Sequence, residues 1–279
     1  MAEKSAECLG FNPNFNARQR IRYIRRLKDT NESTRFFRFC VYVIRMFIYL
    51  KCDRFSEGEE NVPESGAAII IAPHLGSIDA VLAPELVTRR GRMPRILAKK
   101  SLWNIPIVKQ AFNSGRLIQV DRSGTAQDSL EEARIALKNG DTVFIFPEGT
   151  YSKDPDSWPM TCKTGAARLA LISGAPVVPI LQDGEQFLLK KNANRTELPW
   201  FKRYHSGNRV LVHLKAYPAI DFSDIFSGQV SSPDSEIIRK VNERIEDTLT
   251  RIVEESRGVN APKRWDDRLK KRAERGVNG

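Results

Sequence analysis

Strand and helix signals alternate along most of this chain, and the alternation limits which folds it can adopt. Short apolar runs rich in β-branched residues are followed by stretches whose apolar residues recur at helical spacing. The predicted strands are 67–73, 94–98, 116–121, 142–147, 176–182 and 209–215, and the predicted helices are 78–90, 100–113, 125–139 and 163–173. This order is typical of βαβ units, so we predict an α/β fold with a mostly parallel sheet flanked by helices. Such sheets bind ligands at the carboxyl ends of their strands.

The predicted strand 67–73 runs directly into His74, and Asp79 follows five positions later. Five residues of a regular helix rotate by about 500°, so the two side chains would point apart if one helix held both. Gly76 permits a turn, and Ser77 can cap a helix whose first turn contains Asp79. The carboxylate can then bond one imidazole nitrogen and leave the other to take a proton from a hydroxyl group. We predict that His74 is a general base oriented by Asp79.

Further segments stand in the order found in one known protein family. His74 and Asp79 match its His-x4-Asp block, and residues 146–150 read Phe-Pro-Glu-Gly-Thr, its third block, without a change. Other matches are residues 176–179 (Pro-Val-Val-Pro), 163–170 (KTGAARLA) and 98–106 (AKKSLWNIP). Over roughly residues 60–185 the chain therefore resembles the glycerolipid acyltransferases, the family of the lysophosphatidic acid acyltransferases.

The chain departs from the family pattern at two places. In the second block Gly115 stands seven positions before Arg122 instead of six, and Arg116 occupies a position where glycine is expected. After the third block Tyr151 replaces the usual arginine, which removes one candidate phosphate contact that Lys153 could replace. Arg122 itself still matches the arginine of the second block.

The resemblance implies a role for each matched residue. His74 and Asp79 would be catalytic, and the substrate-binding residues would be Arg122, Lys100, Lys163, Glu148, Gly149 and Thr150. The cations would hold an acceptor phosphate, with Arg122 first because a guanidinium fork matches phosphate oxygens. Glu148 would bind a glycerol hydroxyl, and a second interpretation stays open, in which this carboxylate only braces its loop by accepting backbone N–H bonds. Backbone N–H groups near the strand ends would stabilise an oxyanion, with Gly149 allowing close approach.

The N-terminal region concentrates the positive charge of the chain, whose formal net charge of +11 indicates an anionic partner. Two helices are predicted in this basic arm, 17–28 and 35–50. In the second, one stripe consists of Arg35, Arg38, Tyr42, Arg45 and Tyr49, beside a wide aromatic and aliphatic surface. Its arginines leave apolar runs too short to span a bilayer. We predict that the helix lies in the headgroup layer of an anionic membrane; the alternative is a helix packed on the core with solvated arginines.

Other features exclude several classes of protein. The four cysteines show no CxxC spacing and no export signal opens the chain, so we expect a reducing cytoplasmic setting. His205 and His213 have no carboxylate close to them in sequence, and we expect no metal site. Ser-His-Asp hydrolysis would need a G-x-S-x-G elbow, which is absent from the sequence.

Together, these observations and the resemblance predict three segments: a basic membrane-associating helical arm (1–55), an α/β acyltransferase domain (56–257) and a charged tail (258–279). The expected activity is transfer of a fatty acyl group from a CoA or acyl-carrier-protein thioester to lysophosphatidic acid, with no cofactor. The expected location is the cytoplasmic face of the membrane, on anionic phospholipid, as a peripheral or monotopic protein. Glycerol 3-phosphate is the alternative acceptor. A basic nucleic-acid-binding protein is the alternative of another class, but no RNA-binding aromatic motif or helix-turn-helix signature supports it, and we expect no nucleic acid partner.

Overall fold

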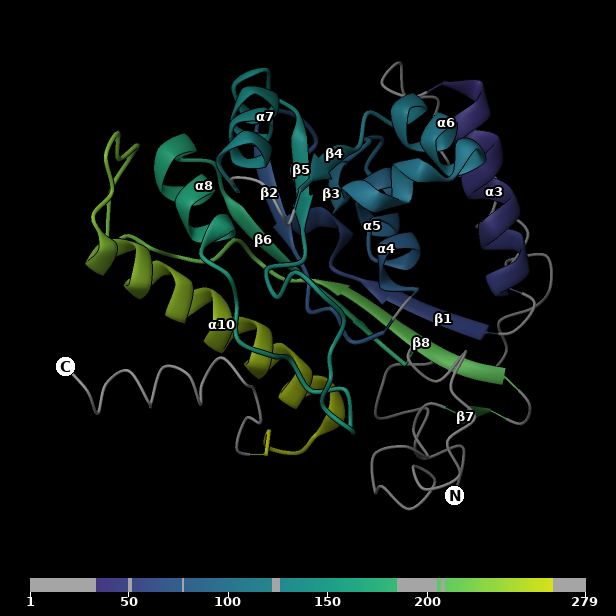
Figure 1. The fold of residues 1–279 in the computed structure, drawn as a ribbon. Coiled ribbons are helices and arrows are strands. Elements are labelled where there is room, and N and C mark those ends of the chain that lie inside the picture. The colour runs from purple at the N-terminus through teal and green to yellow at the C-terminus, as the bar shows by residue number, and fades with distance from the viewer. Residues whose placement is uncertain are drawn as a thin grey trace.

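The computed structural model describes residues 34–49, 52–76, 78–121, 126–184, 205–206 and 209–262. A sheet forms its centre, with strands in the order β1-β8-β6-β2-β5-β3-β4 and β7 paired to β8 (Figure 1). The strands are β1 (Cys52–Glu57), β2 (Ala68–Ile71), β3 (Arg95–Lys99), β4 (Ile118–Val120), β5 (Thr142–Ile145), β6 (Val177–Asp183), β7 (His205–Ser206) and β8 (Arg209–Ala216). Every strand pair is parallel except β6 with β8 and β7 with β8. The predicted α/β fold with a mostly parallel sheet is confirmed.

Helices lie on both faces of the sheet (Figure 1). They are α3 (Arg35–Tyr49), α4 (Asp79–Leu82), α5 (Glu85–Arg89), α6 (Pro106–Ser114), α7 (Ala126–Lys138), α8 (Gly165–Ser173) and α10 (Ser235–Arg257), with 3₁₀ segments η1 (Glu59–Asn61) and η2 (Lys100–Asn104). The predicted helix 78–90 is divided into α4 and α5 at Pro84, which has no N–H to continue the helical bonding. The predicted helix 100–113 is likewise η2 followed by α6, and Pro106 begins the second part.

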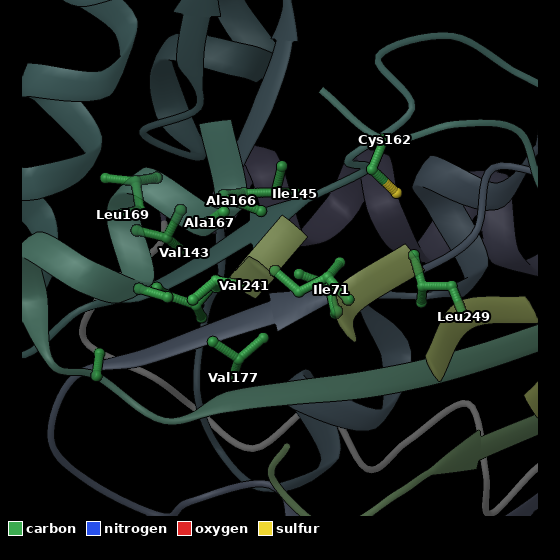
Figure 2. Packing of buried hydrophobic residues seen from close by; sticks show 14 of the residues in the cluster. Ile71, Val143, Ile145, Cys162, Ala166, Ala167, Leu169, Val177, Val241 and Leu249 are labelled. Atoms are coloured by element: carbon green, nitrogen blue, oxygen red, sulfur yellow. The ribbon is translucent and has the colours of Figure 1, made fainter. Parts of the chain in front are cut away.

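The core has two layers because successive strand side chains point to opposite faces of the sheet. On one face, strand residues pack against α7, α8 and α10; Figure 2 shows Ile71, Val143, Ile145 and Val177 beside Ala166, Ala167, Leu169, Val241 and Leu249. On the other face, Ile70, Phe144 and Val178 pack against the short helices α4 and α5. The segment that carries the candidate catalytic pair therefore leaves β2 on the face with the shorter helices.

Four elements were absent from the sequence-based prediction: the short η1 and β7, and the longer β1 and α10. Strand β1 pairs in parallel with β8 at the edge of the sheet and crosses the boundary that we predicted between residues 55 and 56. Helix α10 has 23 residues; Asp234 caps its start and Gly258, with φ 67°, follows its end. Of the predicted tail 258–279, residues 263–279 lie outside the described part of the chain.

Helix α3 packs on the domain through one of its faces. Phe37 is buried, and its ring lies so close to Gly115 that a Cβ atom there would be 2.4 Å from it. Arg45 is also buried, and its Nη2 donates a hydrogen bond of 3.2 Å to Oγ1 of Thr88 on α5. The prediction that the arginine stripe faces the headgroup layer or solvent is therefore wrong for Arg45. Helical periodicity does not reveal which side of a helix meets the domain.

The opposite side of α3 is exposed and apolar. Phe39, Tyr42 and Met46 are exposed on that side, and Ile44, which lies two turns after Phe37 on the same side as Phe37, is exposed as well. Core packing and an exposed apolar surface thus occur on different faces of the same helix. The other predicted helix of the arm, 17–28, lies outside the described residues. None of the described helices is both long enough and apolar enough to cross a membrane.

Candidate active site

His74 and Asp79 meet at the carboxyl end of β2, as the spacing predicts. Nδ1 of His74 lies 2.9 Å from Oδ2 of Asp79, the first residue of α4. Asp79 is fully buried, and the backbone N–H of Gly76 donates to both of its carboxylate oxygens, at 3.0 and 2.9 Å. The turn at Gly76 therefore forms as expected. Ser77, the expected cap, lies outside the described residues, and Ile78 is the residue that precedes the first turn of α4.

The backbone and the ring of His74 are both held in place. Its N–H donates to Oε1 of Glu148 at 2.9 Å, and its carbonyl accepts the N–H of Ser152 at 2.6 Å. Its ring stacks on Phe146 with centroids 4.3 Å apart, and the edge of Tyr151 meets it at 6.2 Å. The side chain remains 17% exposed. Since Asp79 engages Nδ1, Nε2 is the nitrogen that can accept a proton from a substrate.

The loop at residues 146–150 supports His74 more than it offers polar groups to a ligand. Glu148 is buried, and its second oxygen, Oε2, accepts the N–H of Met160 at 3.1 Å. Both carboxylate oxygens thus receive backbone N–H bonds, which favours the loop-bracing interpretation over direct binding of a glycerol hydroxyl. The N–H of Gly149 closes the turn by donating to the carbonyl of Phe146 at 3.0 Å. The binding role of Glu148 and the oxyanion role near Gly149 stay predictions.

The backbone conformation and the surroundings of Gly149 both favour glycine at this position. Its φ of 71° lies in the left-handed region that favours glycine. A Cβ atom there would be 2.9 Å from Cε of Lys163, so the lysine lies directly over the glycine. The N–H of Lys163 donates to the carbonyl of Pro147 at 2.8 Å, which fixes the lysine beside the loop. Thr150 follows Gly149 and is partly buried.

A cavity of about 600 Å³ opens beside His74. It exists because β3 pairs with β5 only through Arg95 and Ile96, whereas residues 97–99 pair with β4. The end of β5 and the end of β3 therefore separate, and the space between them stays open. The walls are mainly apolar and include Val81, Ile96, Leu97, Phe112, Leu117 and Ile145. An extended apolar group can lie in this cavity with one end at the imidazole.

The structure brings some predicted substrate-binding residues to this cavity and leaves others elsewhere. Gly149 and Lys163 line it together with His74. Lys100 instead lines a neighbouring polar pocket of about 530 Å³. There its Nζ lies 2.8 Å from Asp121, which raises the pKa of the Lys100 ammonium above its ordinary value through the hydrogen bond and the negative charge. Arg122 lies outside the described residues.

Sequence reasoning missed two parts of the site. Arg168 on α8 lines the cavity five residues after Lys163, inside the KTGAARLA segment that was already singled out. A buried ion pair also braces the region: Arg257 at the end of α10 bonds both oxygens of Asp183 at 3.1 Å. The same guanidinium donates to the carbonyls of Asp156 and Ser157, each at 3.1 Å, in the loop that follows residue 150. Only the fold brings these groups together.

Comparison with known proteins agrees with this geometry. Residues 54–182 match the family model of the acyltransferases, and they contain the His74–Asp79 pair and the 146–150 loop. This part of the chain is therefore similar to an acyltransferase domain. Among solved structures, the 1-acyl-sn-glycerophosphate (LPA) acyltransferase PlsC from Thermotoga maritima is similar, with a TM-score of 0.53 and 26% identity; the match covers 80% of this chain and 78% of that one.

Curated relatives point to the same family as the acyltransferase domain. A 1-acyl-sn-glycerol-3-phosphate acyltransferase of Escherichia coli K12 is 30% identical over 169 residues, which are 59% of this chain and 61% of the relative. The chloroplastic 1-acyl-sn-glycerol-3-phosphate acyltransferase LPAT1 of Arabidopsis thaliana is 32% identical over 160 residues, 56% of this chain and 42% of the relative. The chain spans about half the length of the curated relatives it matches. The predicted resemblance to glycerolipid acyltransferases is confirmed.

Proposed function

We propose that this protein transfers a fatty acyl group from a thioester to a hydroxyl of lysophosphatidic acid and so forms phosphatidic acid. The observation that carries the proposal is the 2.9 Å contact between His74 and the buried Asp79 at the mouth of an apolar cavity. The names of the relatives, 1-acyl-sn-glycerol-3-phosphate acyltransferases, support the choice of acceptor. The acyl carrier is CoA or acyl carrier protein, and the reaction needs no cofactor.

The geometry supports one sequence of bond changes. The acyl chain lies in the cavity with its thioester carbonyl beside His74. Nε2 takes the proton of the acceptor hydroxyl as its oxygen attacks that carbonyl, and an alcohol needs this help because its pKa is far above neutrality. Collapse of the tetrahedral intermediate breaks the carbon–sulfur bond, and the leaving thiolate takes the proton from the imidazolium. The ester and the free thiol together contain every atom of the two substrates.

The charges around the cavity support a phosphate-bearing acceptor. Lys163 and Arg168 line its wall on the side of α8, and both are exposed. Arg122 stays our first candidate for the phosphate because of its place in the second block, with Lys163 next and Lys100 least direct. A guanidinium or ammonium on the wall of this cavity can hold the phosphate while the hydroxyl reaches Nε2. Glu148 and Thr150 would shape the loop next to the acceptor.

The substrates also suggest where the protein works. Lysophosphatidic acid and phosphatidic acid reside in membranes, and the exposed apolar side of α3 is a surface that can enter the headgroup layer. We propose peripheral or monotopic association with the cytoplasmic face of an anionic membrane. Lysophosphatidic acid can then reach the protein, and phosphatidic acid can leave it, without crossing water.

A thiol-release assay tests the proposed reaction. Purified full-length protein is given one acyl thioester and, in turn, glycerol 3-phosphate, 1-acylglycerol 3-phosphate and a lysophospholipid without a terminal phosphate. We expect the fastest release with 1-acylglycerol 3-phosphate, and phosphatidic acid as the product by mass spectrometry. Faster release with glycerol 3-phosphate would assign the protein to the alternative first-step reaction. Thiol release equal with and without acceptor would show a hydrolase and refute the proposal.

A further inference from the structure

The exposed large hydrophobic side chains of the described residues are concentrated on two neighbouring elements. Four lie on α3 and three on the segment from η2 to α6, whereas only Ile135 and Tyr151 lie elsewhere. We call these seven residues the apolar flank: Phe39, Tyr42, Ile44, Met46, Leu102, Ile105 and Ile107. Ile107 is 72% exposed, more than any of the others. Scattered hydrophobic side chains are normal on a surface, but a concentration of this kind marks an interaction site.

Helix α3 and the η2–α6 segment pack together and form one continuous surface. Helices α3 and α6 pack against each other and stand side by side in Figure 1. The contact is made by Phe37, whose ring lies on Gly115 directly after α6. On the η2–α6 segment the inward side is occupied by Trp103 and Phe112, whose rings meet edge to face at 4.9 Å. Ile105 and Ile107 point outward because the inner positions of the segment are already filled.

The charges of the flank are complementary to an anionic surface. Residues 34–49 and 98–116 contain no Asp or Glu. Their basic residues are Arg35, Arg38, Lys99 and Lys109, together with Arg45, which is buried against Thr88, and Lys100 and Arg116, which pair with Asp121 and Asp141. Helices α7 and α10, in contrast, mix acidic and basic residues along their exposed faces. Exposed apolar side chains on segments that carry cations and no acidic residue of their own fit the interface of an anionic phospholipid bilayer.

The flank also adjoins the cavity beside His74. Leu102 is 39% exposed and lines that cavity, and Phe112 of α6 lines it as well. One segment therefore provides both an outer apolar surface and an inner cavity wall. If the outer surface lies in the acyl region of a bilayer, an acyl chain can move along Leu102 into the cavity without exposure to water.

We propose that the η2–α6 segment is a second membrane-inserting element beside α3, and that Leu102 marks the lateral opening through which acyl chains pass between the bilayer and the cavity. The movement of acyl chains through this opening rests on the proposed acyl transfer. The insertion itself rests only on the exposed side chains and charges of the flank. Ile105 and Ile107 then lie below the lipid headgroups, and Lys99 and Lys109 lie at the depth of the headgroups.

Vesicle binding tests the insertion without any substrate. Full-length protein is sedimented with vesicles of phosphatidylcholine containing phosphatidylglycerol. Ile107→Glu and Ile105→Glu should each weaken binding about tenfold or more, since each removes an isoleucine side chain that would enter the bilayer and puts a charge in its place. The matched control is Ile135→Glu on α7, which is 47% exposed and should bind like the wild type. Unchanged binding by both flank variants would overturn the insertion.

Further outcomes separate this inference from the proposed reaction. A protein that binds vesicles through Ile107 but releases no thiol supports the flank and counts against the acyl transfer. A wild-type protein that ignores vesicles and self-associates through Ile107 shows a protein interface and overturns the inference. For the lateral opening, Leu102→Glu should lower kcat/KM for a long-chain donor about tenfold relative to a four-carbon donor. An equal change for both donors would exclude Leu102 from the path of the chain.

Discussion

The two faces of the sheet are built differently, and each suits a different task. One face is covered by α7, α8 and α10, whose apolar sides close over strand residues such as Ile71 and Val177 in a dry core. The other is covered by the short helices α4 and α5, followed by η2 and α6. Long helices bury more apolar surface per element, so the first face supplies much of the stability. Short helices leave room at the strand ends, where His74 and the cavity lie.

The difference predicts opposite consequences of mutation. On the face covered by α4 and α5, His74 and Asp79 are held together at the turn of Gly76. Replacing either residue should reduce activity while the fold stays intact. On the α10 side, polar residues connect helix to sheet, and their loss should reduce the free energy of unfolding. Four groups of substitutions, taken from the largest expected effect to the smallest, test this division and the packing around it.

The largest effect should come from His74→Ala, which removes the proposed general base. Such assistance contributes about 100- to 10,000-fold, so we expect kcat to fall by that factor with an unchanged melting temperature. Asp79→Asn should cost less, because the imidazole remains but loses the carboxylate 2.9 Å from Nδ1 that orients it. Thiol release and thermal unfolding measured on the same samples provide the check.

His213 is the matched control for His74. Its Nε2 lies 3.2 Å from Oε1 of Glu57, so it is a second histidine paired with a carboxylate, on β8 and away from the cavity lining. His213→Ala should keep its turnover. Near-wild-type activity in a folded His74→Ala protein, or an equal loss in both variants, would refute the mechanism.

On the other face, Arg257→Met should be the costliest substitution for stability. It breaks a fully buried ion pair and leaves Asp183 with its charge uncompensated, which typically costs about 3 to 5 kcal/mol. The matched control is Arg239→Met on the same helix, where an exposed pair with Glu243 at 2.8 Å contributes less than about 1 kcal/mol. Urea unfolding measures both. A similar loss in the two variants would show that burial of the Arg257 pair does not set its contribution.

The sequence was sufficient to predict the contact between His74 and Asp79 because the two residues flank a single turn. Strand β2, Gly76 and Asp79 follow one another directly, so local chemistry determines the geometry. Helices α7 and α8 were predictable for the same reason, since their apolar spacing is visible within one segment.

Features that depend on distant partners could not be predicted in this way. The cavity depends on where β3 leaves β5, and that register is set by the whole sheet. The partner of Arg257 is 74 residues away, and the side of α3 that carries Arg45 is decided by α5. Strand β1 has a polar sequence, CDRFSE, and gives little signal of its own. For α10, Asp234 and Gly258 were usable cap signals that the prediction did not exploit.

A smaller effect should separate the arginines within α3. Arg35→Gln with Arg38→Gln removes two charges near the flank, each worth about 1 kcal/mol at an anionic surface, so binding to anionic vesicles at low salt should weaken about thirtyfold. Arg45→Gln should change vesicle binding little, because Arg45 faces Thr88 inside the protein. It should instead lower the unfolding free energy. Sedimentation measures vesicle binding of both variants, and urea titration measures their unfolding free energy. Weaker vesicle binding by Arg45→Gln would contradict the observed packing.

The smallest effect concerns Glu57, at the end of the sheet near α10. The hydrogen bond from His213, and to a lesser extent the charge of Lys215, lowers the pKa of Glu57 below its ordinary value. A lowered carboxyl pKa stabilises the fold above the unfolded-state pKa, and this stability is lost as the pH falls through the ordinary range of glutamate and below. The side chain is 40% exposed, so solvent screening limits the contribution to less than about 1 kcal/mol. Glu57→Gln should therefore lower the unfolding free energy at pH 7, and the difference from the wild type should shrink between pH 5 and pH 3. Urea titrations across that range measure it, and a difference that grows on acidification would have the wrong sign for this pair.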